Sequence, residues 1–386
     1  MSTSPLPLSF NERQTFALVH RHKKIARTTI SELTGLTATT VSRLVTRLLD
    51  LGLLEEKPDR SGQLGQPRKM LSVRSRQAYS IGVNFMRGRF DIALVDLCGR
   101  IARVDTIRIE EVTAGRIAET AAFRSTEILA QCEIDRDSVV GAGFSVPGGF
   151  SPDGETLLAH EWFPDLDRQT LAPMFSEALG MPCSTDTDGA CATLGEYLYG
   201  QGVDHSTFFL LHLGHGVGGG AIIDGQLYRG AHRNASKPGV LFPYGTPRPS
   251  GQDLLTCLIE AGHDIKDIAD LDRISPESDP TVIAWLDRAA QQIGELGRVI
   301  TAFLDPETII VGGRLPQTFN NALLHRLGKI ELPGPSRGLP NAPFVASSLG
   351  PRSGVLGAAS LPIFGTYYPG ADGTTGNPYI NGRRTM

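Results

Sequence analysis

The sequence lacks any long apolar run. In its 386 residues no apolar stretch approaches the roughly 18 residues that a membrane helix requires. The first residues show neither the basic start nor the apolar core of a signal peptide. The five cysteines form no Cys-x-x-Cys pair and are odd in number, as is typical of a reduced protein. These absences argue against membrane, secreted and structural-zinc proteins, and we expect a cytoplasmic protein.

The composition is that of a folded protein. Hydrophobic residues make up 40% of the chain and charged residues 20%, which is enough apolar material for substantial cores. The length suggests about two or three domains.

Charge is distributed unevenly along the chain. Residues 1–76 hold 13 Lys and Arg against 6 Asp and Glu, a net charge of +7, and the remainder holds 24 against 35, a net charge of −11. A small basic segment before a large acidic one is typical of a nucleic-acid-binding domain joined to a module of another kind.

The basic segment contains the signals of three helices. Ser9 with Glu12, and Thr29 with Glu32, have the spacing of capping boxes, so helices are expected to begin near residues 10 and 30. Thr37 follows a turn that contains glycine and is the expected N-cap of a third helix. A short helix, a turn and a longer helix form a helix-turn-helix arrangement.

The third expected helix has two faces. Its apolar residues recur at the i, i+3, i+4, i+7 spacing of a buried stripe, as Val41, Leu44, Val45 and Leu48. The N-terminal residues of a recognition helix contact base edges, and hydroxyl and guanidinium groups suit bases and phosphates. The residues of this helix expected to bind DNA are Thr39, Thr40, Ser42, Arg43 and Arg47.

Residues 57–73 have the pattern of a β-hairpin, because glycine and proline separate polar stretches. Arg60, Arg68 and Lys69 would lie on this hairpin and contact phosphates or the minor groove. Helices, turn, hairpin and charge together predict a winged helix-turn-helix domain that binds operator DNA. A small three-helix packing domain with incidental arginines is the alternative.

The rest of the chain alternates apolar strands with glycine-rich loops. Examples are VGAGFSVPGG at 140–149, LGHGVGGG at 213–220 and LDPETIIVGG at 304–313, and Asp224-Gly225 predicts a hairpin turn. Strands that open into such loops, separated by helical stretches, indicate an α/β protein with ligand loops at strand ends.

An ordered set of motifs resembles the landmarks of the ROK family (repressors, open reading frames and sugar kinases). The motifs are SVPGG at 145–149, TDTDGACATLGE at 185–196, LGHGVGGGAIIDG at 213–225, LDPETIIVGG at 304–313 and GVLGAAS at 354–360. The resemblance covers nearly the whole chain, and the basic segment is similar to the DNA-binding domain of the family's repressors.

This resemblance implies an α/β fold in which an N-terminal winged helix-turn-helix precedes a two-lobed, actin-like ATPase (sugar-kinase) fold. The expected parts are a DNA-binding domain over residues 1–75, a sugar-kinase-like domain over 76–366 with its lobe boundary near 190–200, and a flexible tail over 367–386.

The first phosphate loop departs from the pattern of the family's kinases. The resemblance implies Asp-x-Gly-Gly-Thr there, whose glycines let the backbone approach ATP phosphates. Asn84 replaces the carboxylate, and Met86 and Arg87 place side chains where phosphate needs bare backbone. In the second, better preserved loop, His215 replaces a threonine. We therefore expect little or no ATP binding, no enzyme activity and no bound cofactor.

The resemblance also implies a ligand site. Asp188 matches the aspartate that deprotonates the sugar hydroxyl in the family's kinases. In a non-kinase it would accept hydrogen bonds from a sugar, and a solvated loop aspartate is the alternative. The residues expected to bind the ligand are Gly148, Thr187, Asp188, Asn234 and Lys237.

The family's zinc site is not expected here. Val240 stands where the family has a histidine that ligates zinc, Lys237 replaces a sugar-binding glutamate, and residues 245–253 contain no cysteine. Zinc needs about four nitrogen or sulfur ligands at close spacing. This loop is instead basic, with His232, Arg233, Asn234 and Lys237 close together in the sequence. Such a loop favours binding of an anionic sugar, either phosphorylated or a sugar acid. Chance surface charges and a vestigial pocket are the alternatives.

Together these patterns predict a cytoplasmic DNA-binding transcriptional regulator, with repression of carbohydrate genes as the expected sign. We expect a homodimer or a dimer of dimers on a palindromic operator, controlled by a sugar or sugar phosphate that binds between the lobes. Two alternatives stay open: an ATP-dependent sugar kinase that carries a DNA-binding head, with Asp188 as its base, and a regulator controlled by a partner protein.

Overall fold

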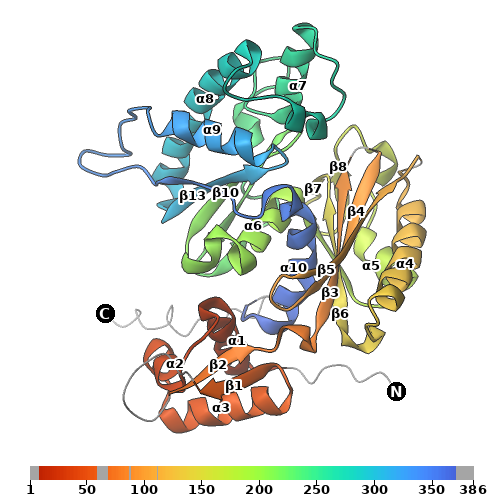
Figure 1. The fold of residues 1–386 in the computed structure, drawn as a ribbon, viewed down its shortest axis with the longest axis vertical. Helices are drawn as coiled ribbons and strands as arrows, with labels where there is room; N and C mark the ends of the chain where they lie inside the picture. Colours follow the sequence, from red (N-terminus) through yellow and green to blue (C-terminus); the bar gives the residue numbers. More distant parts are fainter. Residues whose placement is uncertain (1–7, 59–67, 87, 111, 371–386) are drawn as a thin grey trace.

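The chain forms a small head and two larger α/β lobes, with the head at one end (Figure 1). The computed structural model describes residues 8–58, 68–86, 88–110 and 112–370. Within these ranges, no helix is both long and apolar enough to cross a bilayer.

The head contains the predicted helices and hairpin. Its elements are α1 (Phe10–His22), α2 (Arg27–Thr34), α3 (Ala38–Asp50), β1 (Leu54–Pro58) and β2 (Lys69–Val73), and the two strands pair antiparallel. The capping box of Ser9 and Glu12 begins α1, and the Thr37 hydroxyl caps α3 by accepting from the backbone N–H of Thr40. The buried stripe of α3 is confirmed, since Val41, Val45 and Leu48 have no exposed surface.

The predicted capping box of α2 is wrong. This helix begins at Arg27, after Ala26, which makes no side-chain cap. Thr29 therefore lies inside the first turn of the helix instead of before it. The helix ends at Gly35, the glycine of the expected turn, which takes the left-handed conformation with a φ of 68° that glycine adopts without strain. Residues 59–67 of the predicted hairpin, including Arg60, lie outside the described residues.

The first lobe is built on a five-stranded sheet with the order β5-β4-β3-β6-β9. Its strands are β3 (Tyr79–Met86), β4 (Arg89–Asp96), β5 (Ile101–Arg108), β6 (Val139–Val146) and β9 (Cys183–Thr187). The lobe also contains α4 (Ala114–Gln131), α5 (Leu171–Leu179) and the short hairpin of β7 (Gly148–Phe150) and β8 (Leu157–Ala159). Helices α4 and α5 lie together on one side of this sheet (Figure 1).

The second lobe repeats this arrangement with the order β12-β11-β10-β13-β14. Its strands are β10 (Phe208–Leu213), β11 (Val217–Ile223), β12 (Gln226–Tyr228), β13 (Thr308–Gly313) and β14 (Phe344–Ala346). Its helices are α7 (Gly251–Glu260), α8 (Pro280–Leu304) and α9 (Gln317–Leu327). In both sheets an antiparallel meander of three strands is followed by two parallel strands. This repeat confirms the predicted two-lobed α/β fold.

Two helices lie between the sheets, α6 (Asp188–Tyr199) and α10 (Ser353–Tyr367) (Figure 1). Glycine lets them approach closely, because a Cβ atom on Gly357 would lie 2.1 Å from the carbonyl oxygen of Cys191. α10 also lies directly on the first sheet, where a Cβ atom on Gly82 would be 2.2 Å from the Val355 carbonyl oxygen. The predicted lobe boundary near residues 190–200 falls within or beside α6 and stays a prediction.

The predicted start of the tail at residue 367 is wrong. Tyr367 ends α10, and both it and Tyr368 are buried. The Tyr367 ring lies 5.0 Å from that of Phe16 in α1, and the Tyr368 hydroxyl is 2.7 Å from Nδ1 of His20. These residues form part of the contact between the head and the lobes. The remainder of the predicted tail, residues 371–386, lies outside the described residues.

Candidate functional site

The first candidate site is the outer face of α3. This helix lies on the side of the head that faces away from the two lobes (Figure 1). Thr39 and Arg43 are exposed, and Thr40 and Ser42 are half-buried. The Thr40 hydroxyl lies 2.9 Å from that of Thr37, at the N-terminus of the helix. The predicted hydroxyls and the Arg43 guanidinium therefore share one end and one face of the helix.

Arg47 has a structural partner as well as its predicted role. Its Nε lies 2.8 Å from Oε1 of Glu12, a carboxylate with 8% of its side chain exposed. The other oxygen of Glu12 accepts from the backbone N–H of Ser9, so one carboxylate joins α3 to the start of α1. Nothing in the sequence pattern indicated this ion pair.

The second part of this surface is the hairpin. Arg68 and Lys69 are exposed at the start of β2. The neighbouring strand β1 carries Glu55 and Glu56, which pair with Lys57 and Arg27. Pairing of these acidic groups lowers the repulsion that they would offer to a phosphate backbone.

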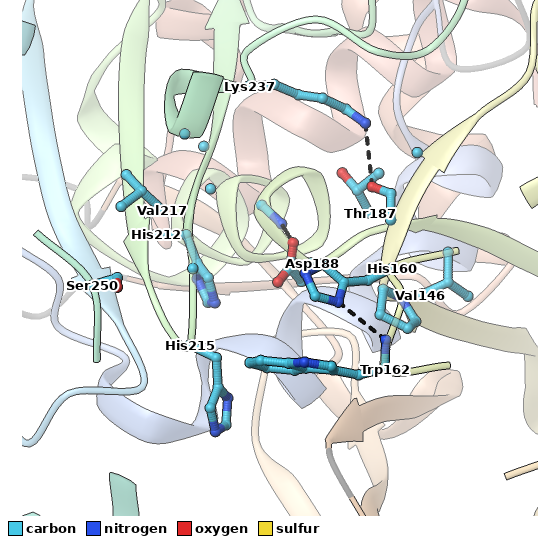
Figure 2. Close-up of a pocket in the computed structure, with 18 of the residues that line it drawn as sticks. Val146, His160, Trp162, Thr187, Asp188, His212, His215, Val217, Lys237 and Ser250 are labelled. Atoms are coloured by element: carbon cyan, nitrogen blue, oxygen red, sulfur yellow. Dashed lines mark hydrogen bonds between the residues drawn. The ribbon is translucent and has the colours of Figure 1, made fainter. Parts of the chain in front are cut away.

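The second candidate site is a cavity of about 830 Å³ between the lobes (Figure 2). The five residues predicted to bind the ligand all line this cavity: Gly148, Thr187, Asp188, Asn234 and Lys237. The first lobe contributes the ends of β6 and β9, and the second lobe contributes the glycine loop after β10 and the loop after β12. The cavity is therefore assembled from strand ends, as expected for an α/β protein.

Asp188 is the first residue of α6 and faces this cavity (Figure 2). Its Oδ1 accepts from the backbone N–H of Gly189 at 2.8 Å. The preceding Thr187 is the N-cap and accepts from the N–H of Ala190. The positive end of the helix dipole favours a carboxylate at this position. Thr187 thus has a local structural role besides the predicted one, and Asp188 keeps an oxygen for a ligand.

The loop after β12 is held mainly to the first lobe. The Asn234 amide accepts from Phe150 N–H at 2.9 Å and donates to the carbonyl oxygens of Phe150 and His232. Arg233 lies 4.1 Å above the Phe150 ring. Asn234 therefore pairs with the edge of β7 like a short strand, a role that the sequence analysis did not include.

Asp186 neutralises much of the loop's positive charge. This aspartate is 1% exposed, and its Oδ2 lies 2.7 Å from Nε of Arg229 and 3.6 Å from Nη2 of Arg233. His232 also turns toward the first lobe, with Nδ1 3.2 Å from the Pro152 carbonyl oxygen. Of the basic residues used to predict an anionic ligand in this loop, Lys237 is the one that lines the cavity.

Lys237 reaches across the cavity rim to the first lobe. Its Nζ donates to the Gly148 carbonyl oxygen at 3.3 Å (Figure 2). Desolvation lowers the pKa of this ammonium, and Asp188 opposes the shift. A Cβ atom on Gly149 would lie 2.1 Å from this Nζ, so a larger residue there would displace the lysine from its present position.

An aromatic wall of the cavity was missed by the sequence analysis. Trp162 lies edge-on to His215 with ring centroids 5.6 Å apart, and His160 lies 4.8 Å from Trp162. Nε2 of His160 is 3.2 Å from the hydroxyl of Tyr244. Aromatic faces of this kind suit the apolar face of a sugar ring. These residues come from three separate loops, so spacing along the chain gave no signal.

The part of the cavity at the ends of β3, β10 and β13 has further side chains. Met86 lines it, whereas Arg87 lies outside the described residues. Arg314, which follows the two glycines that end β13, donates Nη2 to the Phe85 carbonyl oxygen at 2.7 Å. His212 of β10 lines the same region. Neither Arg314 nor His212 was identified from the sequence, because both stand beside glycine motifs that were interpreted as backbone features.

Among the described residues, no group of three or more His, Cys, Asp or Glu side chains is placed so that it could hold a metal ion. Val240, at the position of the family's zinc-ligating histidine, is 80% exposed.

Comparisons with known proteins agree with this two-part structure. A model of the ROK family matches residues 80–241, and a model of the MarR family matches residues 6–63. An uncharacterized protein, y4fQ of Sinorhizobium fredii, is 42% identical over 378 residues, which cover 98% of this chain and 96% of that protein.

Two further similarities concern named regulators. A putative xylose repressor of Caldicellulosiruptor is 28% identical over 222 residues, which cover 56% of this chain and about half, 55%, of the repressor. The solved structure of a ROK family transcriptional regulator, a homologue of the E. coli MLC protein, has a TM-score of 0.69 at 20% identity and covers 93% of this chain and 96% of its own. The chain belongs to the ROK family, with a MarR-like winged helix domain at its N-terminus.

Proposed function

We propose that this protein is a DNA-binding transcriptional repressor of carbohydrate genes, released from its operator by a sugar or sugar derivative in the interlobe cavity. The observation that carries the proposal is the outward face of α3, where Thr39 and Arg43 are exposed while the opposite side of the head contacts the lobes. A recognition helix needs this arrangement, because its N-terminal residues must enter the major groove.

The relatives support this function. One is named a putative xylose repressor, and others are named xylose repressor and NagC, a transcriptional dual regulator. We extend repression and sugar response from them to this chain. Binding as a homodimer or a dimer of dimers follows from the geometry of the winged helix, since two recognition helices on successive major-groove faces read a palindrome.

Two helices connect the cavity with the head. α6 begins at Asp188 in the cavity and ends at Tyr199, whose ring lies 5.8 Å from that of His20. α10 lies against α6 and ends at Tyr367, in contact with Phe16. A ligand that changes the closure of the lobes would move these helices together and shift the population of DNA-competent heads.

The test is binding of the purified protein to DNA from its own upstream region. We expect sequence-specific binding that weakens as the salt concentration rises, because phosphate contacts release counterions, and that one sugar or sugar phosphate releases. Absence of specific binding at low salt would contradict the proposal. Specific binding that no sugar changes would instead favour a regulator controlled by a partner protein.

A second candidate function is that of a sugar kinase with a DNA-binding head. Asp188, in the cavity at the start of α6, favours it, because its free oxygen could take a proton from a sugar hydroxyl. Met86 and Arg314 argue against it, because both line this cavity and Arg314 lies beside Gly214 of the glycine loop. A coupled ATPase assay with a panel of sugars distinguishes the two, and sugar-dependent turnover would favour the kinase.

A further inference from the structure

We propose that His212 and Arg314 form an oxyanion subsite of the interlobe cavity, which binds the phosphoryl or carboxylate group of the ligand. This inference rests on the proposed function, because it assumes that the cavity receives a sugar derivative. His212 lies beside Asp188 in the cavity (Figure 2), and Arg314 lines the same cavity next to Gly214 of the glycine loop at residues 213–220.

His212 is a buried imidazole without a partner. It is 3% exposed and lines the cavity. Neither Nδ1 nor Nε2 has a hydrogen-bond partner among the described residues. Its neighbours on the adjacent strands are Gly218 and Gly312, which place no side chain beside the ring. Because an unpaired buried polar group costs free energy, this ring is suited to a partner that enters the cavity.

Three side chains form a row over the glycine loop. The position that a Cβ atom would take on Gly218 lies 3.6 Å from Oδ1 of Asp188 and 3.8 Å from Cβ of His212. The corresponding position on Gly214 lies 3.7 Å from Nε2 of His212 and 3.6 Å from Cδ of Arg314. These distances place the side chains along the loop in the order Asp188, His212 and Arg314, with the histidine in the middle.

Arg314 supplies a fixed cation at the end of this row. Its Nη2 donates to Phe85, and this is one of five N–H donors that a guanidinium carries. The contact with Phe85 holds the side chain across the space between β13 and β3, so that other donors are left for a ligand. A guanidinium in a fixed orientation binds two oxygens of a phosphoryl or carboxylate group at once.

The row also indicates how a ligand would be oriented. Asp188, which accepts hydrogen bonds, suits the hydroxyl groups of a sugar, whereas Arg314 at the other end suits an acidic group. An oxyanion between His212 and Arg314 is separated from the Asp188 carboxylate by the imidazole. A sugar phosphate or a sugar acid has both kinds of group in one molecule.

Binding of an oxyanion here should be coupled to proton uptake. Burial lowers the pKa of His212, with Asp188 opposing the shift and Arg314 adding to it, and this shift favours the neutral form of the ring. These are the charged groups that face the ring, from the start of α6 and the end of β13, because β11 and β13 place glycines beside it. An anion against the imidazole favours its charged form.

The experiment is isothermal titration calorimetry on the full-length protein with inorganic phosphate, glucose 6-phosphate, glucuronate and, as the neutral reference, glucose. We expect wild type to bind at least one acidic probe, and His212→Asn and Arg314→Gln each to weaken that binding by about tenfold or more. For glucuronate, whose carboxylate stays ionised near pH 7 (about the range in which histidine titrates), the observed binding enthalpy should depend on the ionisation enthalpy of the buffer in wild type and not in His212→Asn.

Arg116→Gln is the matched control. It removes one exposed arginine on α4, outside the cavity, and leaves the row intact, so we expect an unchanged affinity for the acidic probes. If Arg314→Gln does not fold, Arg314→Lys keeps the charge but loses two-point binding and should also weaken the acidic probes.

Acidic probes that bind wild type and both variants equally, or that do not bind wild type, would overturn the subsite. Operator binding by the same preparations separates this result from the proposed function. Its absence in wild type would contradict the regulator, while the calorimetry still decides whether His212 and Arg314 hold an oxyanion.

Discussion

The hydroxyl oxygen of Tyr368 lies 2.7 Å from Nδ1 of His20, and this contact joins the residue after α10 to helix α1 of the head. Nε2 of the same ring is 2.8 Å from the carbonyl oxygen of Leu97 in the first lobe. Because a carbonyl only accepts, Nε2 carries the proton, and Nδ1 of the neutral ring accepts from the tyrosine hydroxyl. One buried histidine thus connects the head to both α10 and the first lobe.

Tyr368→Phe should loosen the head. The substitution keeps the ring packing and leaves Nδ1 of His20 buried without a donor, which costs about 1–3 kcal/mol. We expect the free energy of opening measured by hydrogen exchange at the α1 amides to fall by a corresponding amount, because the lost hydrogen bond is part of the contact that holds this helix to the lobes. Tyr228→Phe is the control, since that side chain is 51% exposed. Equal protection of α1 in all three proteins would contradict a role for this contact.

The head contact should also weaken in mild acid. Burial lowers the pKa of His20 below its usual value, although the Leu97 carbonyl and Asp96 oppose the shift. Since the unfolded chain then binds more protons than the folded one, the stabilisation is present above the unfolded pKa of about 6.5 and is lost as the pH falls below it.

Hydrogen exchange of the α1 amides, compared between about pH 7.5 and pH 5.5, tests the predicted weakening in acid. Wild type should lose protection over that interval, and His20→Gln, which carries no titrating ring, should lose less. His212, whose pKa is also lowered by burial, lies in the cavity and is common to both proteins. Identical pH dependence in the two would show that His20 does not titrate in this range.

Local signals were sufficient to predict the head. The caps at Ser9 and Thr37 and the spacing of Val41, Leu44 and Leu48 define helices through contacts a few residues apart, and such contacts are visible in a sequence. The failed prediction at Thr29 has the same origin: the capping-box spacing was present, but the helix begins at Arg27, after Ala26, which makes no side-chain cap.

The candidate site was predictable only in part. The glycine motifs and Asp188 predicted a ligand site at the strand ends where the cavity lies. These residues can be recognised in a sequence because the local backbone geometry of such loops requires glycine. Arg233 was counted as a ligand-binding charge, yet it pairs with Asp186 across 46 intervening residues of chain, and no local pattern shows such a partner. The same holds for Tyr368, whose partner His20 lies at the opposite end of the chain.

Arg43→Ala should weaken operator binding without affecting the fold. Arg43 is exposed on α3, so its removal leaves the core intact and deletes a base or phosphate contact worth about 1–3 kcal/mol. Binding to upstream DNA at matched salt measures this, and Arg116→Ala on α4 is the control that removes one exposed charge elsewhere. Unchanged affinity of Arg43→Ala would exclude a contact with the operator.

Arg47→Ala should behave differently from Arg43→Ala. The guanidinium of Arg47 pairs with Glu12, whose carboxylate is nearly buried, so its loss affects the α1–α3 contact as well as DNA binding. We expect a lower melting temperature of the head together with weaker operator binding. A variant that binds DNA more weakly at unchanged stability would assign Arg47 to the interface with DNA alone.

Gly357→Ala should separate the two helices that connect the cavity with the head. The added Cβ atom would lie 2.1 Å from the carbonyl oxygen of Cys191 and 2.8 Å from the backbone nitrogen of Ala192, and backbone atoms cannot move aside without shifting α6. Overpacking of this kind costs about 1–3 kcal/mol or more, so thermal unfolding should begin at a lower temperature. Gly115→Ala in α4 is the matched control, because nothing lies within 4 Å of its added Cβ and alanine favours a helix by about 0.5–1 kcal/mol.

Since α6 starts at Asp188 and ends beside His20, Gly357→Ala should also reduce sugar-dependent release of the operator. Full release in a destabilised variant would show that this helix pair does not carry the signal.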